Sequence, residues 1–288
     1  MIELSQEWVD NVIPSRNPEA DKNTFGRIVC ICGSAGYTGA AYFSAQGAVR
    51  MGSGIVTLAA PRMAWTTLAV KLNAPVVRPL PCTEDGFFSL DALPQLLKLA
   101  ERADALLIGC GLGQSPELAQ FVCTLLEKVK TQIVLDADGI NAIIPHKDIL
   151  QRTARPVILT PHAREFFRLS DIETPSPVQL TDFAQKNHCI LLYKRHRTLI
   201  AAPDGQIYRN HSGNPGMAKG GSGDILAGML TSLCGQGIEP VKAACAAAYL
   251  HGRAGDIAAN RYGEYSMTPD DLLSCLPDVL KRYNTKEW

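Results

Sequence analysis

Short apolar runs alternate with longer segments of helical periodicity along most of the chain. The first apolar run covers residues 27–32 and stops at a glycine, and a helical segment follows over 40–51. Further short runs cover 54–60, 104–108, 132–136, 157–160 and 190–193. This alternation predicts an α/β fold with a mostly parallel central sheet. Ligands gather at the carboxyl ends of parallel strands, so the residues that follow each run are the first candidates for function.

The pattern changes after Lys194. Residues 198–202 and 206–209 flank a Pro-Asp-Gly turn and predict an antiparallel hairpin at the edge of the sheet. The remainder reads as helix over 224–234, 241–260 and 270–282. We therefore expect a three-layer α/β/α sandwich. One domain should cover residues 25–288, and residues 1–24 should form an N-terminal extension or a first helix.

Composition narrows the class of function. The 288 residues are 46% hydrophobic and carry 28 basic and 28 acidic side chains. A net charge of zero gives no general attraction to nucleic acid or to an anionic membrane, so a small-molecule enzyme is favoured. The nine cysteines are scattered without a Cys-x-x-Cys pair, which favours buried free thiols in a reducing compartment over a zinc site. With neither a signal-like start nor a membrane-length apolar run, we expect a cytoplasmic protein.

The glycine-dense segment 214–224, Asn-Pro-Gly-Met-Ala-Lys-Gly-Gly-Ser-Gly-Asp, runs directly into an apolar helix. Glycines leave backbone N–H groups accessible, and a helix N-terminus attracts anions, so this segment suits a phosphate or a developing oxyanion. Asp224 could be an ordinary helix cap or a general base. A cap does not need three glycines in the four preceding positions, whereas an anion hole beside a base does. We predict Asp224 as the catalytic base and Gly221, Ser222 and Gly223 as the anion hole.

This segment resembles the anion-hole motif of the nucleotide-dependent NAD(P)H-hydrate dehydratases, which belong to the ribokinase-like superfamily. The resemblance runs from about Phe25 to the end of the chain. Other family motifs occur in the same order, and these are Gly33-Ser-Ala-Gly-Tyr-Thr-Gly-Ala-Ala41, Gly109-Cys-Gly-Leu-Gly113, Leu135-Asp-Ala-Asp-Gly-Ile-Asn141, Thr160-Pro-His-Ala-Arg-Glu-Phe166 and Lys194-Arg-His-Arg-Thr198. In the last motif Arg195 stands where the family has glycine, which puts the turn geometry or the nucleotide affinity in question.

The resemblance implies roles for individual residues. Substrate would contact Ala40, Gly111, Gly113, His162 and Asp224. The nucleotide would contact Lys194, Arg195, His196, Arg197, Thr198, Asn214 and Gly223. Glu165, and with it Asp136, would hold Mg²⁺ through water. On spacing alone, Asp138 is as consistent with a helix cap as with ligand contact. Tyr249-Leu250-His251-Gly252 resembles a signature near the adenine pocket and is interpreted mainly as packing.

The implied substrate is the S epimer of hydrated NADH or NADPH. Asp224 would take a proton from the hydroxyl at carbon 6 of the nicotinamide ring as this hydroxyl attacks the terminal phosphate of a nucleotide. Elimination of phosphate would then restore NAD(P)H. Bacterial members of the family typically use ADP and eukaryotic ones ATP. The chain shows no targeting segment, which favours a bacterial protein and therefore ADP as the donor. The family also implies a homotetramer, and with no epimerase-like domain before Phe25 the chain would be the dehydratase alone.

Two other functions use the same motifs. A small-molecule kinase of the superfamily, acting on thiazole or pyrimidine alcohols, would use the same Gly-Asp segment, but the segments 33–41 and 160–162 match the dehydratase branch more closely. A catalytically idle nucleotide-binding regulator is the second alternative, and Arg195 is its only support. Retention of Asp224 with its glycines argues against that alternative.

Overall fold

A computed structural model describes residues 1–283 of the chain. Its centre is one ten-stranded sheet in the order β1-β10-β9-β8-β7-β6-β5-β2-β3-β4. Only β9 runs antiparallel to its neighbours, β8 and β10. The strands are β1 (Ile2–Glu3), β2 (Arg27–Ile31), β3 (Ile55–Pro61), β4 (Val76–Leu80), β5 (Ala105–Ile108), β6 (Gln132–Leu135), β7 (Val157–Leu159), β8 (Cys189–Tyr193), β9 (Leu199–Ala201) and β10 (Ile207–Arg209).

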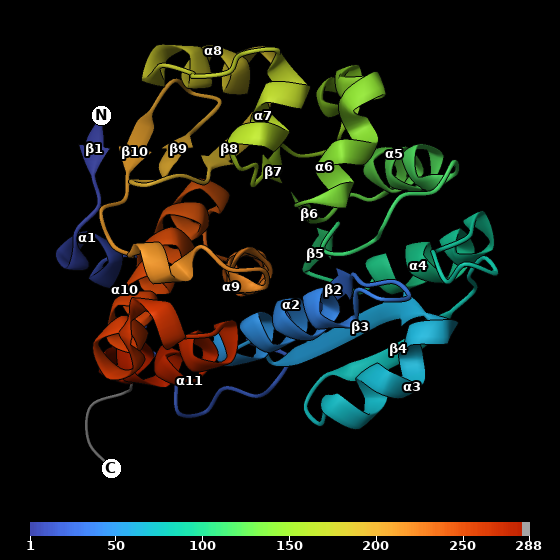
Figure 1. Ribbon diagram of the computed structural model, residues 1–288, viewed down its shortest axis with the longest axis horizontal. Coiled ribbons are helices and arrows are strands. Elements are labelled where there is room, and N and C mark those ends of the chain that lie inside the picture. Colours follow the sequence, from blue (N-terminus) through green and yellow to red (C-terminus); the bar gives the residue numbers. More distant parts are fainter. Residues whose placement is uncertain (284–288) are drawn as a thin grey trace.

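Helices cover both faces of the sheet (Figure 1). One face carries α2 (Thr38–Arg50), α3 (Arg62–Lys71), α9 (Ser222–Gly235), α10 (Pro240–Ser266) and α11 (Pro269–Leu280). The other carries η1 (Leu90–Ala92), α4 (Leu93–Ala100), α5 (Leu118–Lys128), α6 (Asp138–Ile143), η2 (Ile144–Arg152), α7 (Ala163–Ser170) and α8 (Pro177–Lys186). The short turns η3 (Pro215–Met217) and η4 (Lys281–Tyr283) complete the described elements. The predicted α/β/α sandwich with a mostly parallel sheet is therefore confirmed.

The predicted strands agree with the observed ones to within one residue at each end. The prediction of 241–260 was too short, because α10 extends to Ser266 across a non-helical residue, Gly263, whose φ is 76°. Within residues 1–283, no helix combines the length and the hydrophobicity that crossing a bilayer requires.

The N-terminal segment joins the sheet. β1 pairs in parallel with β10 beyond the predicted hairpin, and the short helix α1 (Gln6–Asp10) follows it. Leu4 and Val9 are buried in the same apolar cluster as α9 and α10, and the Trp8 ring meets the Tyr208 ring edge-on. Residues 1–10 thus form part of the sandwich.

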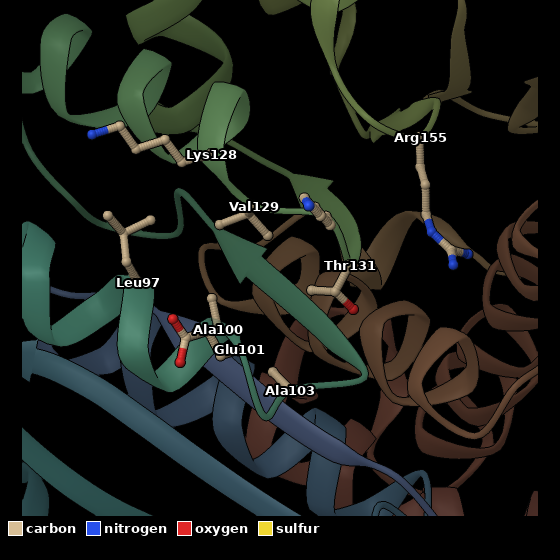
Figure 2. Close-up of a pocket in the computed structure, with 9 residues that line it drawn as sticks. Leu97, Ala100, Glu101, Ala103, Lys128, Val129, Thr131 and Arg155 are labelled. Carbon is tan, nitrogen blue, oxygen red and sulfur yellow. The ribbon is translucent and has the colours of Figure 1, made fainter.

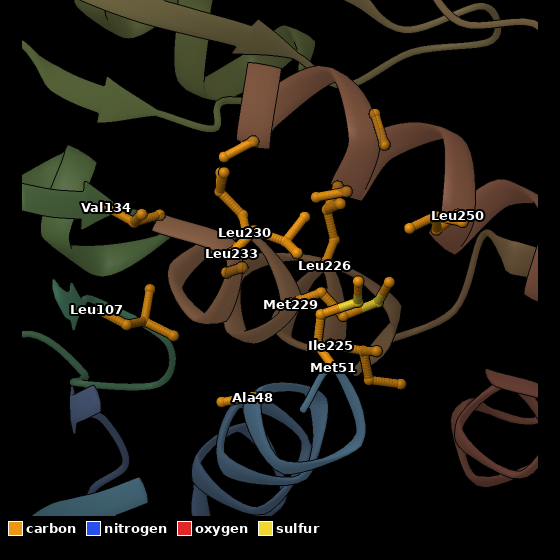
Figure 3. Packing of buried hydrophobic residues seen from close by; sticks show 14 of the residues in the cluster. Ala48, Met51, Leu107, Val134, Ile225, Leu226, Met229, Leu230, Leu233 and Leu250 are labelled. Carbon is orange, nitrogen blue, oxygen red and sulfur yellow. The ribbon is translucent and has the colours of Figure 1, made fainter. Parts of the chain in front are cut away.

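Helix α9 is the most enclosed helix of this face. Figure 3 shows Ile225, Leu226, Met229, Leu230 and Leu233 projecting from it toward α2, toward the strands β5 and β6 and toward α10. A helix that is apolar on all sides is stable only when it is surrounded.

Two glycines allow α2 and α9 to cross closely. A Cβ atom on Gly47 would lie 2.5 Å from the carbonyl oxygen of Ile225, and one on Gly228 would lie 2.0 Å from that of Ser44. Both contacts are with backbone, which cannot rotate away. The close approach therefore fixes the position of α9 and of the glycine-dense segment at its start.

We predict that Gly47→Ala lowers the free energy of unfolding by about 1–3 kcal/mol, because the added methyl group pushes the two backbones apart. Gly39→Ala in the same helix is the matched control, since a Cβ there has nothing within 4 Å. The control should be neutral or slightly stabilising. Urea denaturation of both variants checks this, and equal stabilities would contradict the proposed close contact.

Candidate functional site

The carboxyl ends of β5, β6, β7 and β8 meet at a buried acidic side chain, Asp136. This residue is 2% exposed and follows β6 directly. Its Oδ1 accepts hydrogen bonds from the Nζ of Lys194 and from the Oγ1 of Thr160, each at 2.7 Å. The thiol of Cys110 donates to its Oδ2 at 3.4 Å. Burial acts to lower the pKa of Lys194, but the charges of Asp136 and Glu165 outweigh it and raise that pKa, so the ammonium ion persists in the pair.

Asp224 is not a helix cap. Helix α9 begins at Ser222, its N-cap is Gly221 with a φ of 105°, and no side chain caps it. Asp224 is therefore the third residue of the helix. Its carboxylate, the Asp136 carboxylate and the Cys110 sulfur have ligand atoms within 4.8 Å of one another. Burial, followed by repulsion from Asp136, raises the pKa of Asp224 to about 7. A carboxylate with this pKa can accept a proton near neutral pH.

The start of α9 offers backbone donors beside this carboxylate. Among residues 1–283, the N–H groups of Gly223 and Asp224 have no hydrogen-bond partner. The helix dipole places about half a positive charge at the same end. A Cβ on Gly223 would lie 3.4 Å from the Nζ of Lys194, so an ammonium ion is adjacent. Asp224 and the N–H of Gly223 thus lie together, next to a cation, whereas the N–H of Ser222, also predicted for the anion hole, donates to the carbonyl of Lys219 at 3.3 Å.

The two loops predicted to bind substrate lie against each other. The Oγ of Ser34 donates to the carbonyl of Gly111 at 2.9 Å. A Cβ on Gly111 would lie 2.8 Å from the Cβ of Ala40, which shows how close the loops are. Asp138 does not cap α6, whose N-cap is Ala137, and instead accepts a hydrogen bond from the N–H of Gly113 at 2.9 Å. The capping interpretation of Asp138 was therefore wrong, and its contact is with the neighbouring loop that contains Gly113.

His162 and Glu165 form a capping box at the start of α7. The Nδ1 of His162 accepts from the N–H groups of Arg164 and Glu165, and Glu165 accepts from the N–H of His162 at 2.8 Å. The helix expected after Pro161 is present. The Glu165 side chain is 6% exposed and that of His162 is 49% exposed, so the imidazole is the more accessible of the two.

A cavity of about 790 Å³ lies beside the start of α9 and contains all seven residues predicted to contact a nucleotide. Asn214 accepts from the N–H of Gly216 at 3.0 Å and donates to Asp256 at 3.2 Å, which fixes the loop on one wall. The residues that line the cavity are His162, Lys194, Arg195, His196, Arg197, Thr198, Asn210, His211, Ser212, Gly213, Asn214, Pro215, Met217, Ala218, Lys219, Ser222, Gly223, Leu226, Ala248, His251 and Gly252.

The turn that contains Arg195 keeps an ordinary backbone at that position. In residues 1–283, the non-glycine residues with positive φ include Arg197, at 60°, but not Arg195. The glycine of the family pattern is therefore not required here for a left-handed conformation. The oxygen of Arg195 accepts from the Oγ1 of Thr198 at 3.2 Å, which closes the turn.

A second cavity, of about 640 Å³, lies at the opposite, amino-terminal ends of the strands (Figure 2). It is lined by Leu97, Ala100, Glu101, Ala103, Lys128, Val129, Lys130, Thr131 and Arg155, several of which come just before β5, β6 and β7. The sequence picks out none of these residues for chemistry. The candidate site is therefore the cavity at the carboxyl ends of the strands.

Comparison with known proteins decides the family. The model of the NAD(P)H-hydrate dehydratase family matches residues 28–278. The chain belongs to this family. It is 40% identical to a bifunctional NAD(P)H-hydrate repair enzyme of Moorella thermoacetica, over 96% of this chain and 53% of that protein. It is 30% identical to the ADP-dependent (S)-NAD(P)H-hydrate dehydratase of Bacillus subtilis, over 97% and 98% of the two chains. The chain thus spans about half the length of the bifunctional relatives.

Solved structures agree with this assignment. A ribokinase-like superfamily protein of Enterococcus faecalis superposes with a TM-score of 0.85 at 28% identity, over 98% of this chain and 96% of that one. The ADP/ATP-dependent NAD(P)H-hydrate dehydratase of Bacillus subtilis, co-crystallised with ATP and Mg²⁺, superposes with a TM-score of 0.81 at 28% identity, over 98% of both chains. The predicted ribokinase-like fold of this dehydratase family member is confirmed.

Several contacts of the candidate site escape sequence reasoning. Thr160 and Cys110 contact Asp136, although neither was assigned a role. The Nζ of Lys219 donates to the carbonyls of Tyr265 and Met267 and ties the glycine-dense segment to the end of α10. His251 contacts Ser222 at the start of α9. Their only signal in the sequence is their place within motifs.

The raised pKa of Asp224 predicts a pH-dependent stability difference. An acid whose pKa is higher in the folded state destabilises the fold as pH rises from its unfolded value of about 4 to its folded value of about 7. Asp224→Asn removes this effect, so its stability relative to the native protein should increase by about 3 kcal/mol between pH 5 and pH 8. Thermal or urea unfolding at both pH values measures it. If the two proteins differ in stability by the same amount at pH 5 and pH 8, the pKa of Asp224 is not raised by burial.

Proposed function

We propose that this chain dehydrates the S epimer of hydrated NADH or NADPH at the expense of a nucleotide, and so restores the reduced cofactor. The observation that carries the proposal is the placement of Asp224. Asp224 directly follows Gly223, which lines the cavity of the predicted nucleotide-binding residues, and within residues 1–283 the N–H groups of both residues are unpaired. The proposal agrees with two relatives, the NAD(P)H-hydrate repair enzyme of Moorella thermoacetica and the (S)-NAD(P)H-hydrate dehydratase of Bacillus subtilis.

In the proposed reaction, the Asp224 carboxylate accepts the proton of the hydroxyl at carbon 6 of the nicotinamide ring. The hydroxyl oxygen then attacks the terminal phosphorus of the nucleotide, and the bond from that phosphorus to the leaving nucleotide oxygen breaks. The N–H groups of Gly223 and Asp224 stabilise the negative charge on the transferred phosphoryl group. Lys194, next to Gly223, contributes a positive charge.

Elimination completes the proposed reaction. The lone pair of the ring nitrogen expels phosphate from carbon 6, and loss of a proton from carbon 5 forms the ring double bond. The products are NAD(P)H, inorganic phosphate and a nucleotide shortened by one phosphate. Hydroxide is a poor leaving group and phosphate a good one, which explains why the nucleotide is consumed.

A magnesium ion fits the proposal in the chemistry of its donors. Carboxylate oxygens are ligands that Mg²⁺ takes, commonly through water. Glu165 and Asp136 are the predicted holders, although Asp136 already contacts Lys194, Thr160 and Cys110, and Glu165 already accepts from the N–H of His162. When bound, the ion would neutralise phosphate charge. The solved dehydratase of Bacillus subtilis was co-crystallised with Mg²⁺ and ATP.

ADP is the proposed phosphate donor, as in the ADP-dependent dehydratase of Bacillus subtilis. Arg195 and Arg197 line the cavity that would hold it, and neither has an acidic partner among residues 1–283. Cytoplasmic location and a homotetrameric assembly are further expectations that rest on composition and family resemblance.

The test is recovery of absorbance at 340 nm when hydrated NADH is mixed with the protein, Mg²⁺ and either ADP or ATP. We expect recovery with ADP and stoichiometric release of phosphate.

Asp224→Asn should reduce turnover by about two to four orders of magnitude while nucleotide binding stays measurable, because only the base is lost. Near-normal turnover in this variant would remove Asp224 from the mechanism. A phosphorylated alcohol in place of NADH and phosphate would indicate a kinase.

The rate should depend on pH with a midpoint near the pKa of Asp224, which burial and Asp136 raise to about 7. Below this value the carboxyl is protonated and cannot act as a base, so kcat should rise as pH increases from 5.5 to 8. Initial rates over this range, with nucleotide saturating, provide the measurement. A rate that is flat across it would mean that proton transfer to Asp224 does not limit turnover.

A further inference from the structure

His251 lies beneath the start of α9, in a motif that the proposed reaction leaves without a role. It belongs to α10 and is 7% exposed. Its Nε2 lies 2.9 Å from the carbonyl oxygen of Ser222 and 3.4 Å from the Oγ of the same residue. A carbonyl oxygen can only accept, so the Nε2 atom must carry the hydrogen. The contact therefore fixes the tautomer of the ring.

The carbonyl of Ser222 and the N–H of Gly223 belong to the same peptide group. This group is planar, and the described chain contains no cis peptide, so its C=O and N–H point in opposite directions. The N–H of Gly223 is one of the two unpaired donors at the start of α9, and Gly223 lines the large cavity. A hydrogen bond that holds the carbonyl therefore also helps to hold the direction of the N–H of Gly223.

The carbonyl of Ser222 is the first inside α9 and accepts from the N–H of Leu226 within the helix, but the residues before it add little further restraint. Gly220 and Gly221 have no side chains, and a Cβ on Gly220 would have nothing within 4 Å. No side chain caps the helix. The bond from His251 is therefore a second restraint on this carbonyl, and it comes from outside the segment.

Helix α10 can supply that support because it is itself fixed. The Nδ2 of Asn210 donates to the carbonyl of Ala248 at 3.1 Å, and the Oγ of Ser212 donates to that of Tyr249 at 2.8 Å. A Cβ on Gly252 would lie 2.1 Å from the Oγ of Ser212, so the loop and the helix are in close contact on both sides of His251.

The imidazole acts as a neutral donor. Burial is the largest cause and, together with the charge of Lys194, outweighs the opposing contact with Ser222 and lowers the pKa of His251 to about 4. The ring therefore brings no charge of its own to an anion near Gly223. Any effect of His251 must come from the hydrogen bond that it donates.

We propose that His251 is a positioning residue, whose bond to the carbonyl of Ser222 aims the N–H of Gly223 at the phosphate group in the cavity. The identification of this phosphate as the transferred one rests on the proposed function. The role of His251 in orienting the N–H does not depend on it. A preorganised donor stabilises an anion more strongly than one that must first be ordered.

Two amide substitutions test the proposal. Glutamine places a donor nitrogen at about the position of Nε2, whereas the shorter asparagine does not reach it. The measurement is the affinity for inorganic phosphate, by calorimetry, which needs no turnover. We expect His251→Gln to stay within about threefold of the native affinity and His251→Asn to lose about tenfold. Cys245→Ala, a buried change on the same helix, is the control and should bind phosphate normally.

In the turnover assay, His251→Asn should lower kcat by about ten- to a hundredfold with a smaller change in the KM for ADP, and His251→Gln should restore kcat. Loss of phosphate affinity in a folded glutamine variant would overturn the proposal, as would native affinity in both variants. If the asparagine variant does not fold, the glutamine variant still decides. If the native protein never regenerates NADH but phosphate binding follows the expected order, the proposed function fails and the role of His251 stands.

Discussion

The candidate site depends on the enclosure of one helix. α9 is apolar on nearly every side, so it must lie between the sheet, α2 and α10, and the contacts at Gly47 and Gly228 leave it little freedom to shift. Its N-terminus consequently lies at the carboxyl ends of β5 and β6, where the loops that follow the strands converge. The positive end of a buried helix, its unpaired N–H groups and Asp224 are placed together by hydrophobic packing. Chemistry at the site is therefore a consequence of the core.

Electrostatics at the site come from two acids and one shared cation. Asp136 and Asp224 are close enough for repulsion to raise the pKa of Asp224, and Lys194 pairs with Asp136, which is the more deeply buried. The pair keeps a negative charge at Asp136, and that charge helps to make Asp224 a base near neutral pH. The ionised Asp224 lowers the stability of the folded protein, since burial favours the neutral form of its carboxyl group. A strained carboxylate inside a well-packed frame is typical of an active site.

Sequence reasoning succeeded where local pattern and packing agree. The central strands are fully buried on both faces, so they appear as uninterrupted apolar runs, and their ends could be placed within one residue. Strand β4 was not identified, because it is an edge strand with exposed positions and an internal proline, Pro79. The sequence correctly indicated that Asp224 is not a helix cap, but it left capping open for Asp138. Both are acidic residues at the start of a helix, and that pattern is the same for a cap and for a functional residue. Only the three-dimensional contact with Gly113 distinguishes them.

The single departure from the family pattern carries less weight than its position suggests. Glycine is needed where the backbone adopts positive φ or where a side chain would meet its neighbours. In this turn the positive φ belongs to Arg197, while the backbone at Arg195 lies outside that region. The Arg195 side chain also borders a cavity rather than a packed interior. An arginine can therefore occupy the position without distorting the turn, and it adds a cation to a wall that a nucleotide phosphate would face. The residue that gave the idle regulator its only support is thus equally consistent with a working nucleotide site, and Asp224 with its unpaired N–H groups favours the enzyme.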